Sequence, residues 1–182
     1  MTTNTLLVNS ISTALDGVYT CEISGDCGDV TTDPMILTVD ENVNITTQPS
    51  GQTVCPGTNI QFEVVATGSD LTYQWLLDGA NIAGETNSNL ILSDVNNADE
   101  GDYRVSVIGA CETKLSNAAT LTLNDPVAIT SPPSSQAICE GNNATLTVVT
   151  TGTSRSFQWK KNGLELSNGG DISGVNSNTL LL

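Results

Sequence analysis

An internal repeat runs through this chain and limits its fold more than any other feature. The stretch ITTQPSGQTVCPGTNI begins at Ile45 and returns as ITSPPSSQAICEGNNA at Ile129, 84 residues later. At the same spacing, YQWLLDG from Tyr73 returns as FQWKKNG from Phe157. The chain is therefore expected to use one supersecondary unit more than once.

The phase of the repeat predicts one complete domain and two partial ones. Only residues 42–124 contain every part of the unit in order, whereas residues 1–41 match its second half. Residues 125–182 match its first half, with an insertion around NGGDISG. The first ten residues lack the basic stretch and the cleavage site of a signal peptide, so any export signal is expected outside this sequence.

Apolar and polar residues alternate within each unit, which is the period of a β-strand with one buried face. No segment has helical periodicity with caps at both ends, so helices are expected to be single turns. The pattern predicts an all-β sandwich. The residues expected to face inward are Ile60, Phe62, Val64, Ala66, Tyr73, Trp75, Leu77, Leu90, Leu92, Tyr103, Val105 and Val107.

A Trp on the third strand and the later DEGDY motif resemble the immunoglobulin-like pattern, with a core Trp and a tyrosine corner. Within that superfamily the chain resembles the repeats of large bacterial cell-surface proteins, especially from the Bacteroidota, which follow C-x-G…W…G…D-x-G-x-Y…C. The matching residues are Cys55, Gly57, Trp75, Gly79, Asp99, Gly101, Tyr103 and Cys111, then Cys139, Gly141, Trp159 and Gly163, and finally Gly17, Tyr19 and Cys27. Leu15 stands where the corner Asp would be, so a looser corner is expected there.

Five cysteines without any histidine, in an acidic and Thr-rich chain, favour disulfides over zinc or thiol chemistry. Cys55 precedes the second strand of the complete domain, and Cys111 lies at the turn between its last two strands. We expect both at the same pole and bonded, which would stabilise the domain by roughly 4 kcal/mol.

The other three cysteines have no partner in their own part of the repeat. In the repeat register, Cys139 and Cys27 would each bond to a residue of a missing half, or to each other between two chains. Cys21 takes the position of Val105 and is expected to be a buried free thiol that packs as a small apolar residue.

The charge and composition exclude several classes of function. Only 5 Lys and Arg oppose 20 Asp and Glu, for a formal net charge of -15, which disfavours nucleic acid and anionic lipid as partners. No apolar run is long enough to cross a bilayer. Catalytic triads that need histidine are excluded, and the paired acids have no predicted cleft, so we expect no enzymatic activity and no cofactor.

Two further groups have a functional and a structural interpretation. The turn SDVNNADEGD gathers Asp94, Asn96, Asp99 and Asp102, which resembles an oxygen-rich calcium site, but it lacks EF-hand spacing, and solvated turn chemistry is favoured. Trp75 and Trp159 alternate with apolar residues, which favours core packing over stacking on sugars. Tyr103 and Tyr19 are the corresponding core markers of the second half of the unit.

These observations lead to a structural and adhesive hypothesis. The resemblance implies an extracellular array of immunoglobulin-like repeats on a bacterial surface, which acts as a stalk or filament, with a role in attachment or gliding. Its partners would be neighbouring repeats or further copies of itself. Two alternatives stay open: a module that recognises a glycan or protein, and a subunit that completes its half-domains between chains.

Overall fold

The computed structural model describes residues 5–182, and over that range the chain is all-β, as the alternation predicts. Helix is limited within these residues to two 3₁₀ turns, η1 (Thr13–Leu15) and η2 (Asn97–Asp99). Residues 1–4, part of the predicted segment 1–41 and of the stretch without a signal-peptide pattern, lie outside the described residues. None of the described helices has the length and apolar character needed to cross a bilayer.

The described residues form two compact units. The first combines the chain up to Gly51 with Gln61–Ile91 and Gly101–Thr120. Its strands are β1 (Gly17–Tyr19), β2 (Glu22–Gly25), β3 (Gly28–Thr31), β4 (Met35–Leu37), β5 (Asn44–Thr47), β7 (Ile60–Glu63), β8 (Val65–Thr67), β9 (Thr72–Leu77), β10 (Ala80–Asn81), β11 (Asn89–Leu92), β12 (Gly101–Ile108) and β13 (Thr113–Leu115).

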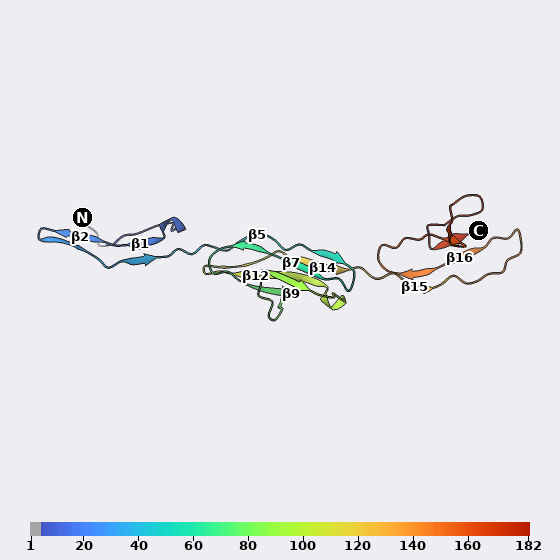
Figure 1. Ribbon diagram of the computed structural model, residues 1–182, viewed down its shortest axis with the longest axis horizontal. Coiled ribbons are helices and arrows are strands. Elements are labelled where there is room, and N and C mark those ends of the chain that lie inside the picture. Colours follow the sequence, from blue (N-terminus) through green and yellow to red (C-terminus); the bar gives the residue numbers. More distant parts are fainter. Residues whose placement is uncertain (1–4) are drawn as a thin grey trace. The chain divides into compact units, whose positions relative to one another are not determined.

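The long antiparallel pair β9 and β12 organises this unit, and both strands lie in the green part of the ribbon (Figure 1). The register runs from Tyr103 opposite Leu77 to Ile108 opposite Thr72. The full strand order of the sheet is β10-β9-β12-β14-β6, where β14 is Ala119–Leu123 and β6 is Gln52–Val54, and β13 pairs with β12. Separate two-stranded ladders join β7 to β11 and β5 to β8.

Aromatic rings fill the core between these strands. Phe62 stacks on Tyr103 with ring centroids 4.8 Å apart, and its centroid lies 6.2 Å from that of Trp75. The burial of alternate residues confirms the predicted inward faces at eight of the positions: Ile60, Phe62, Val64, Trp75, Leu90, Tyr103, Val105 and Val107. The remaining four, Ala66, Tyr73, Leu77 and Leu92, are half-buried.

The second compact unit combines Gln52–Ile60, Leu92–Glu100 and Leu121–Leu182. In this unit β6 pairs in parallel with the end of β14, with Val54 opposite Leu123. Its strands are β6 (Gln52–Val54), the end of β14 (Ala119–Leu123), β15 (Ala128–Ser131), β16 (Thr145–Thr147), β17 (Val149–Thr151), β18 (Lys160–Lys161), β19 (Leu164–Glu165) and β20 (Thr179–Leu181). The ladders are β15-β17, β16-β20 and β18-β19.

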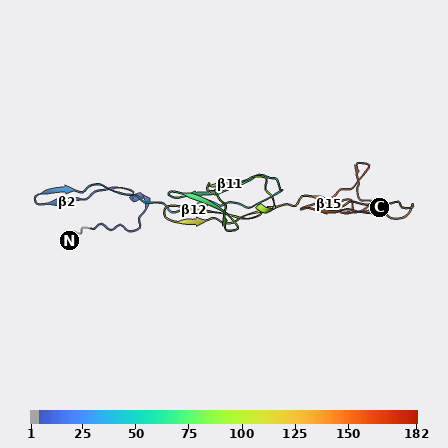
Figure 2. The ribbon, with the colours of Figure 1, turned by 90° about the horizontal axis from the view of Figure 1, so that it is seen from below.

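Residues 5–41 form two short ladders, β1 with β4 and the hairpin β2-β3, which appears in blue in Figure 2. All residues of the hairpin are exposed, including Cys27 at its turn. In the later copy the equivalent of β1 and β2 is the single strand β12, which has eight residues and is buried on one face. The domain boundaries after residues 41 and 124 remain predictions from the sequence.

Matched glycines provide a test of how differently the copies are packed. A methyl group on Gly109 would lie 2.7 Å from Cγ2 of buried Val43 and 3.1 Å from the carbonyl oxygen of Ser69. Gly25 occupies the equivalent position, and there the nearest atom would be 3.8 Å away.

We therefore expect Gly109→Ala to lower the free energy of unfolding by about 1–3 kcal/mol, because the core cannot yield at Val43. The matched variant Gly25→Ala should change it by less than about 0.5 kcal/mol. Chemical denaturation followed by circular dichroism measures both. Equal losses in the two variants would show that the copies are packed alike.

Candidate interaction face

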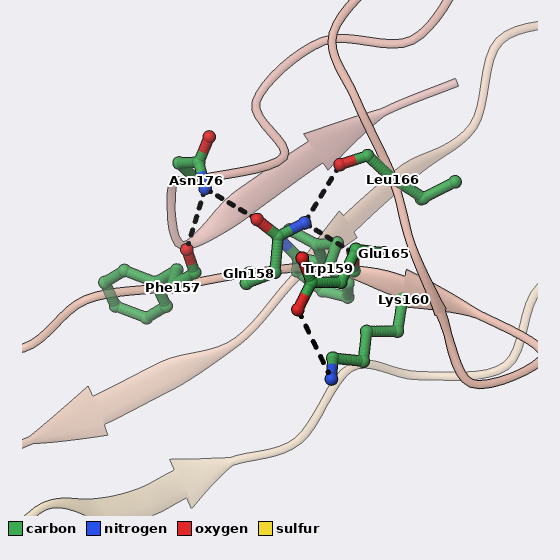
Figure 3. Close-up of polar contacts among 7 residues, drawn as sticks. All are labelled: Phe157, Gln158, Trp159, Lys160, Glu165, Leu166 and Asn176. Carbon is green, nitrogen blue, oxygen red and sulfur yellow. Dashed lines mark hydrogen bonds and ion pairs between the residues drawn. The ribbon is translucent and has the colours of Figure 1, made fainter.

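The strand around Trp159 is braced by side-chain amides (Figure 3). Gln158 Nε2 donates to the carbonyl oxygens of Trp159 and Leu166, both at 2.9 Å. Asn176 Nδ2 donates to Gln158 Oε1 at 2.9 Å and to the Phe157 carbonyl at 3.2 Å. Lys160 and Glu165 form an exposed ion pair at 3.6 Å. These contacts fix the backbone that carries Trp159.

The earlier copy holds Trp75 with the same bonds. Gln74 Nε2 donates to the carbonyls of Trp75 and Ile82, and the Trp75 indole donates to Asn87 at 2.9 Å. In the later copy the Trp159 indole donates to Ser177, also at 2.9 Å. The glutamines were not among the residues predicted to matter, although a Gln precedes the Trp in both copies.

The two tryptophans differ in exposure despite these identical bonds. Trp75 is fully buried, whereas Trp159 is only half-buried, so the expected core packing is incomplete there. A groove of about 610 Å³ lies beside Trp159. Its lining includes Pro133, Ile138, Ala144, Leu146 and Leu182. Ser134, Ser135 and Gln136 complete the lining, so the groove beside Trp159 is only partly apolar.

The 5–41 segment also keeps its local bonds and lacks a full core. The Tyr19 hydroxyl donates to the Leu15 carbonyl at 2.7 Å, so the tyrosine corner forms although Leu15 replaces Asp. Asp16 Oδ1 accepts from Val39 at 2.5 Å, as Glu100 Oε1 accepts from Leu123 at 2.6 Å. Tyr19 is half-buried, whereas Tyr103 is buried.

Residues of the acidic turn form hydrogen bonds with one another and with nearby residues of the fold. Asn96 and Asp99 form a capping box on η2, and Asp102 accepts from the Thr120 hydroxyl at 2.6 Å. The Asp94 amide donates to the Asn59 side chain. Among residues 5–182 no three His, Cys, Asp or Glu side chains are grouped as metal ligands. The three carboxylates of the weaker calcium interpretation, Asp94, Asp99 and Asp102, thus do not form such a group.

The expected Cys55–Cys111 disulfide is not formed, because the structure has both as free, exposed thiols. Cys55 follows Val54, which pairs with Leu123. The Leu123 amide donates to the side chain of Glu100, the residue directly before β12, so Cys55 lies near the start of β12. Cys111 comes after β12, and that eight-residue strand is roughly 23 Å long at about 3.3 Å per residue. A disulfide requires Cα atoms within about 7 Å. The expectation of a shared pole thus fails on the strand topology.

The remaining cysteines are also free and exposed. Cys21 was expected to be buried, but the exposed strand β2 follows it at once, and its thiol lies 3.8 Å from the Glu22 carbonyl at the surface. Cys27 and Cys139 occupy the repeat positions of Cys111 and Cys55. The topology that separates the first pair argues equally against a bond between these two.

Known proteins identify the class of fold. Residues 44–108 match the immunoglobulin domain family. The muscle M-line assembly protein unc-89 of Caenorhabditis elegans is 26% identical over 127 residues, which are 63% of this chain and 2% of that protein. Sidekick-1 immunoglobulin domains 1–5 give a TM-score of 0.64 at 18% identity, covering 95% of this chain and 41% of the other. Extracellular domains 3–5 of Drosophila OTK give 0.57 at 20% identity, covering 95% and 63%.

The fold is therefore that of immunoglobulin-like β-sandwich repeats in tandem, as the Trp and tyrosine-corner pattern implied. The chain spans only a small part of its curated relative and less than two thirds of these two solved structures. The organisms named with these matches, Caenorhabditis elegans and Drosophila, are animals, whereas the sequence resemblance pointed to bacterial surface proteins.

The free thiols lead to a test by substitution. Cys55→Ser and Cys111→Ser should each change the free energy of unfolding by less than about 0.5 kcal/mol, since both residues are exposed and unbonded. Urea denaturation without reductant measures this, and Cys139→Ser is the matched control. A loss of about 2–5 kcal/mol in both variants, absent with reductant, would demonstrate a bridge.

Proposed function

We propose that this chain is part of an extracellular stalk of immunoglobulin-like repeats whose role is to space or present adhesive surfaces. The observation that carries the proposal is a pair of hydrogen bonds that fastens each linker to the repeat that follows it. We call this pair the linker clasp.

The linker clasp occurs twice at equivalent positions. Glu41 donates its amide to the Ser69 hydroxyl at 2.9 Å and accepts from the Ser69 amide at 3.3 Å. Asp125 donates to the Thr153 hydroxyl at 2.8 Å and accepts from the Thr153 amide at 3.0 Å. A backbone bonded on both sides loses most of its freedom, which suits a semi-rigid spacer.

Further contacts strengthen the first linker. Val43 is fully buried two residues after Glu41, and Lys114 Nζ donates to its carbonyl oxygen. The connections are also short: β4 ends at Leu37 before β5 begins at Asn44, and β14 ends at Leu123 before β15 begins at Ala128. Short, fastened connections favour a mechanical role over a flexible tether.

The place of this stalk is proposed from its relatives and its motifs. The similar structures include extracellular domains of Drosophila OTK and five immunoglobulin domains of Sidekick-1. The cell-surface pattern with Cys55, Trp75 and Tyr103 supports a bacterial surface, with attachment or gliding as its setting. The stalk proposed here depends on hydrogen bonds and apolar packing and needs no disulfide.

Backbone ¹⁵N relaxation on the intact chain tests the linker clasp. The Glu41 amide should have an order parameter near about 0.85, typical of rigid backbone. Ser69→Ala removes one clasp bond and should lower that value towards about 0.6. Ser69→Thr is the matched control, since Thr153 serves in the later copy, and it should behave like the native chain.

A flexible Glu41 in the native chain would contradict the spacer role. Saturable binding of the purified chain to a glycan array would instead favour the alternative of a recognition module.

A further inference from the structure

We propose that the open edge of strand β9 in the complete repeat binds an extended, basic peptide segment of a partner protein, which pairs with the backbone of Tyr73 as an added strand. We call this place the Tyr73 edge and define it as residues 71–74 together with the facing residues 86–88. The proposal goes beyond the stalk, because it concerns one edge inside the complete repeat and does not depend on the linker clasp.

The backbone of Tyr73 is unpaired on one side. Trp75, two residues later, donates its amide to the Glu85 carbonyl at 3.0 Å, and its own carbonyl accepts from the Ile82 amide at 2.9 Å. Alternate residues of a strand direct their backbone groups to the same side, so those of Tyr73 face this edge. The pairing of β10 with β9 does not extend to Tyr73, and within residues 5–182 no other segment bonds to its amide or carbonyl.

A groove of about 670 Å³ lies along this edge. Its lining includes Leu71, Tyr73 and Gln74 from one segment and Thr86, Asn87 and Ser88 from the other. Both segments belong to the first compact unit. An open strand edge recruits an extended polypeptide, because main-chain hydrogen bonds supply the affinity and a groove beside the edge accepts alternate side chains.

The later copy closes the equivalent edge with a side chain. Phe157 corresponds to Tyr73, and its carbonyl accepts from Asn176 Nδ2 at 3.2 Å (Figure 3). The same amide group donates to Gln158 Oε1 at 2.9 Å, which holds it in place. This asparagine therefore occupies the acceptor that an added strand would need.

Thr86 stands where the later copy has Asn176. The alignment rests on the two tryptophan amides, which donate to the carbonyls of Glu85 and Val175, the residues directly before. Within residues 5–182 the Thr86 side chain makes no bond to the carbonyl of Tyr73. The exchange of asparagine for threonine thus leaves this edge of the complete repeat open.

A second difference also reduces the groove of the later copy. Arg155 stands in the place of Leu71, and its Nη1 donates to the Thr150 carbonyl. The groove beside it measures about 260 Å³, less than half of the volume beside Tyr73. The open edge is therefore a property of the complete repeat and does not follow from the repeat pattern alone.

Charge selects a basic peptide as the occupant. Asp70 and Glu85 directly precede the two segments of the Tyr73 edge, and neither takes part in an ion pair within the described part of the chain. Cross-strand pairs of opposite charge stabilise an added strand. The formal net charge of -15 disfavours a second copy of this chain as the occupant, because the two copies repel each other.

Selection from a displayed library of random peptides, each about nine residues long, against the intact chain tests the proposal. Enriched peptides should be rich in β-branched and basic residues, and calorimetry measures the affinity of a synthetic one. Thr86→Asn supplies the amide that closes the later copy, with Gln74 in the place of Gln158, and should weaken this affinity about tenfold. Thr86→Ser is the matched control, which adds no amide and should bind like the native chain.

Two further measurements show whether the peptide binds as a strand. N-methylation of the peptide amides that face the edge should abolish binding, whereas N-methylation of the alternating amides should not, since only every second residue bonds across one edge. In ¹H–¹⁵N spectra, titration with the peptide should shift the Tyr73 amide.

A library without enriched peptides would overturn the proposal, as would peptides that bind Thr86→Asn as tightly as the native chain. Association between copies that Thr86→Asn removes, measured by sedimentation, would assign the edge to a second copy instead. Unchanged thermal unfolding of both variants establishes that the complete repeat is intact. The order parameter of Glu41 reports on the linker clasp separately, so failure of peptide binding and failure of the stalk proposal are distinguishable.

Discussion

The pairing of β9 with β12 is the interaction on which the structure depends. It joins the two halves of the repeat, and through it the ring of Tyr103 reaches Phe62 and Trp75 to complete the core. Where the partner strand is missing, the same sequence pattern gives short strands and exposed apolar residues. Local bonds such as those of Gln158 and Tyr19 persist there, because they lie within one half. Local hydrogen bonds are therefore separable from tertiary packing in this chain, whereas strand length is not.

Much of this fold could be predicted because strand alternation is a local signal. The inward positions of Phe62, Trp75 and Val105 follow from period two alone. The exposure of Trp159 could not be read from its own motif, which is nearly the same as that of Trp75, because it depends on the missing partner strand. The open face was still implied by the phase of the repeat, which assigned residues 125–182 only half of a unit.

The cysteines illustrate where sequence reasoning fails. The spacing of Cys55 and Cys111 is compatible with a bridge, but β6 pairs in parallel with the end of β14, and that pairing has no local sequence signal. It separates the two thiols by the length of a strand. Stability then depends on the packed rings and the apolar core, with burial of each large side chain contributing about 1.5–3 kcal/mol. The hydrogen bonds of the linker residues Glu41 and Asp125 likewise have no local sequence signal, since they reach residues 28 positions later in the chain.

Hydrogen exchange on the intact chain at low protein concentration tests the central claim most directly. Amides of β9 and β12 should exchange only with global unfolding, while their equivalents around Gln158 and in β1 and β2 should exchange much faster. Comparable protection of all three copies in a monomer would contradict the account, because it would mean that the flanking segments are closed sandwiches of their own.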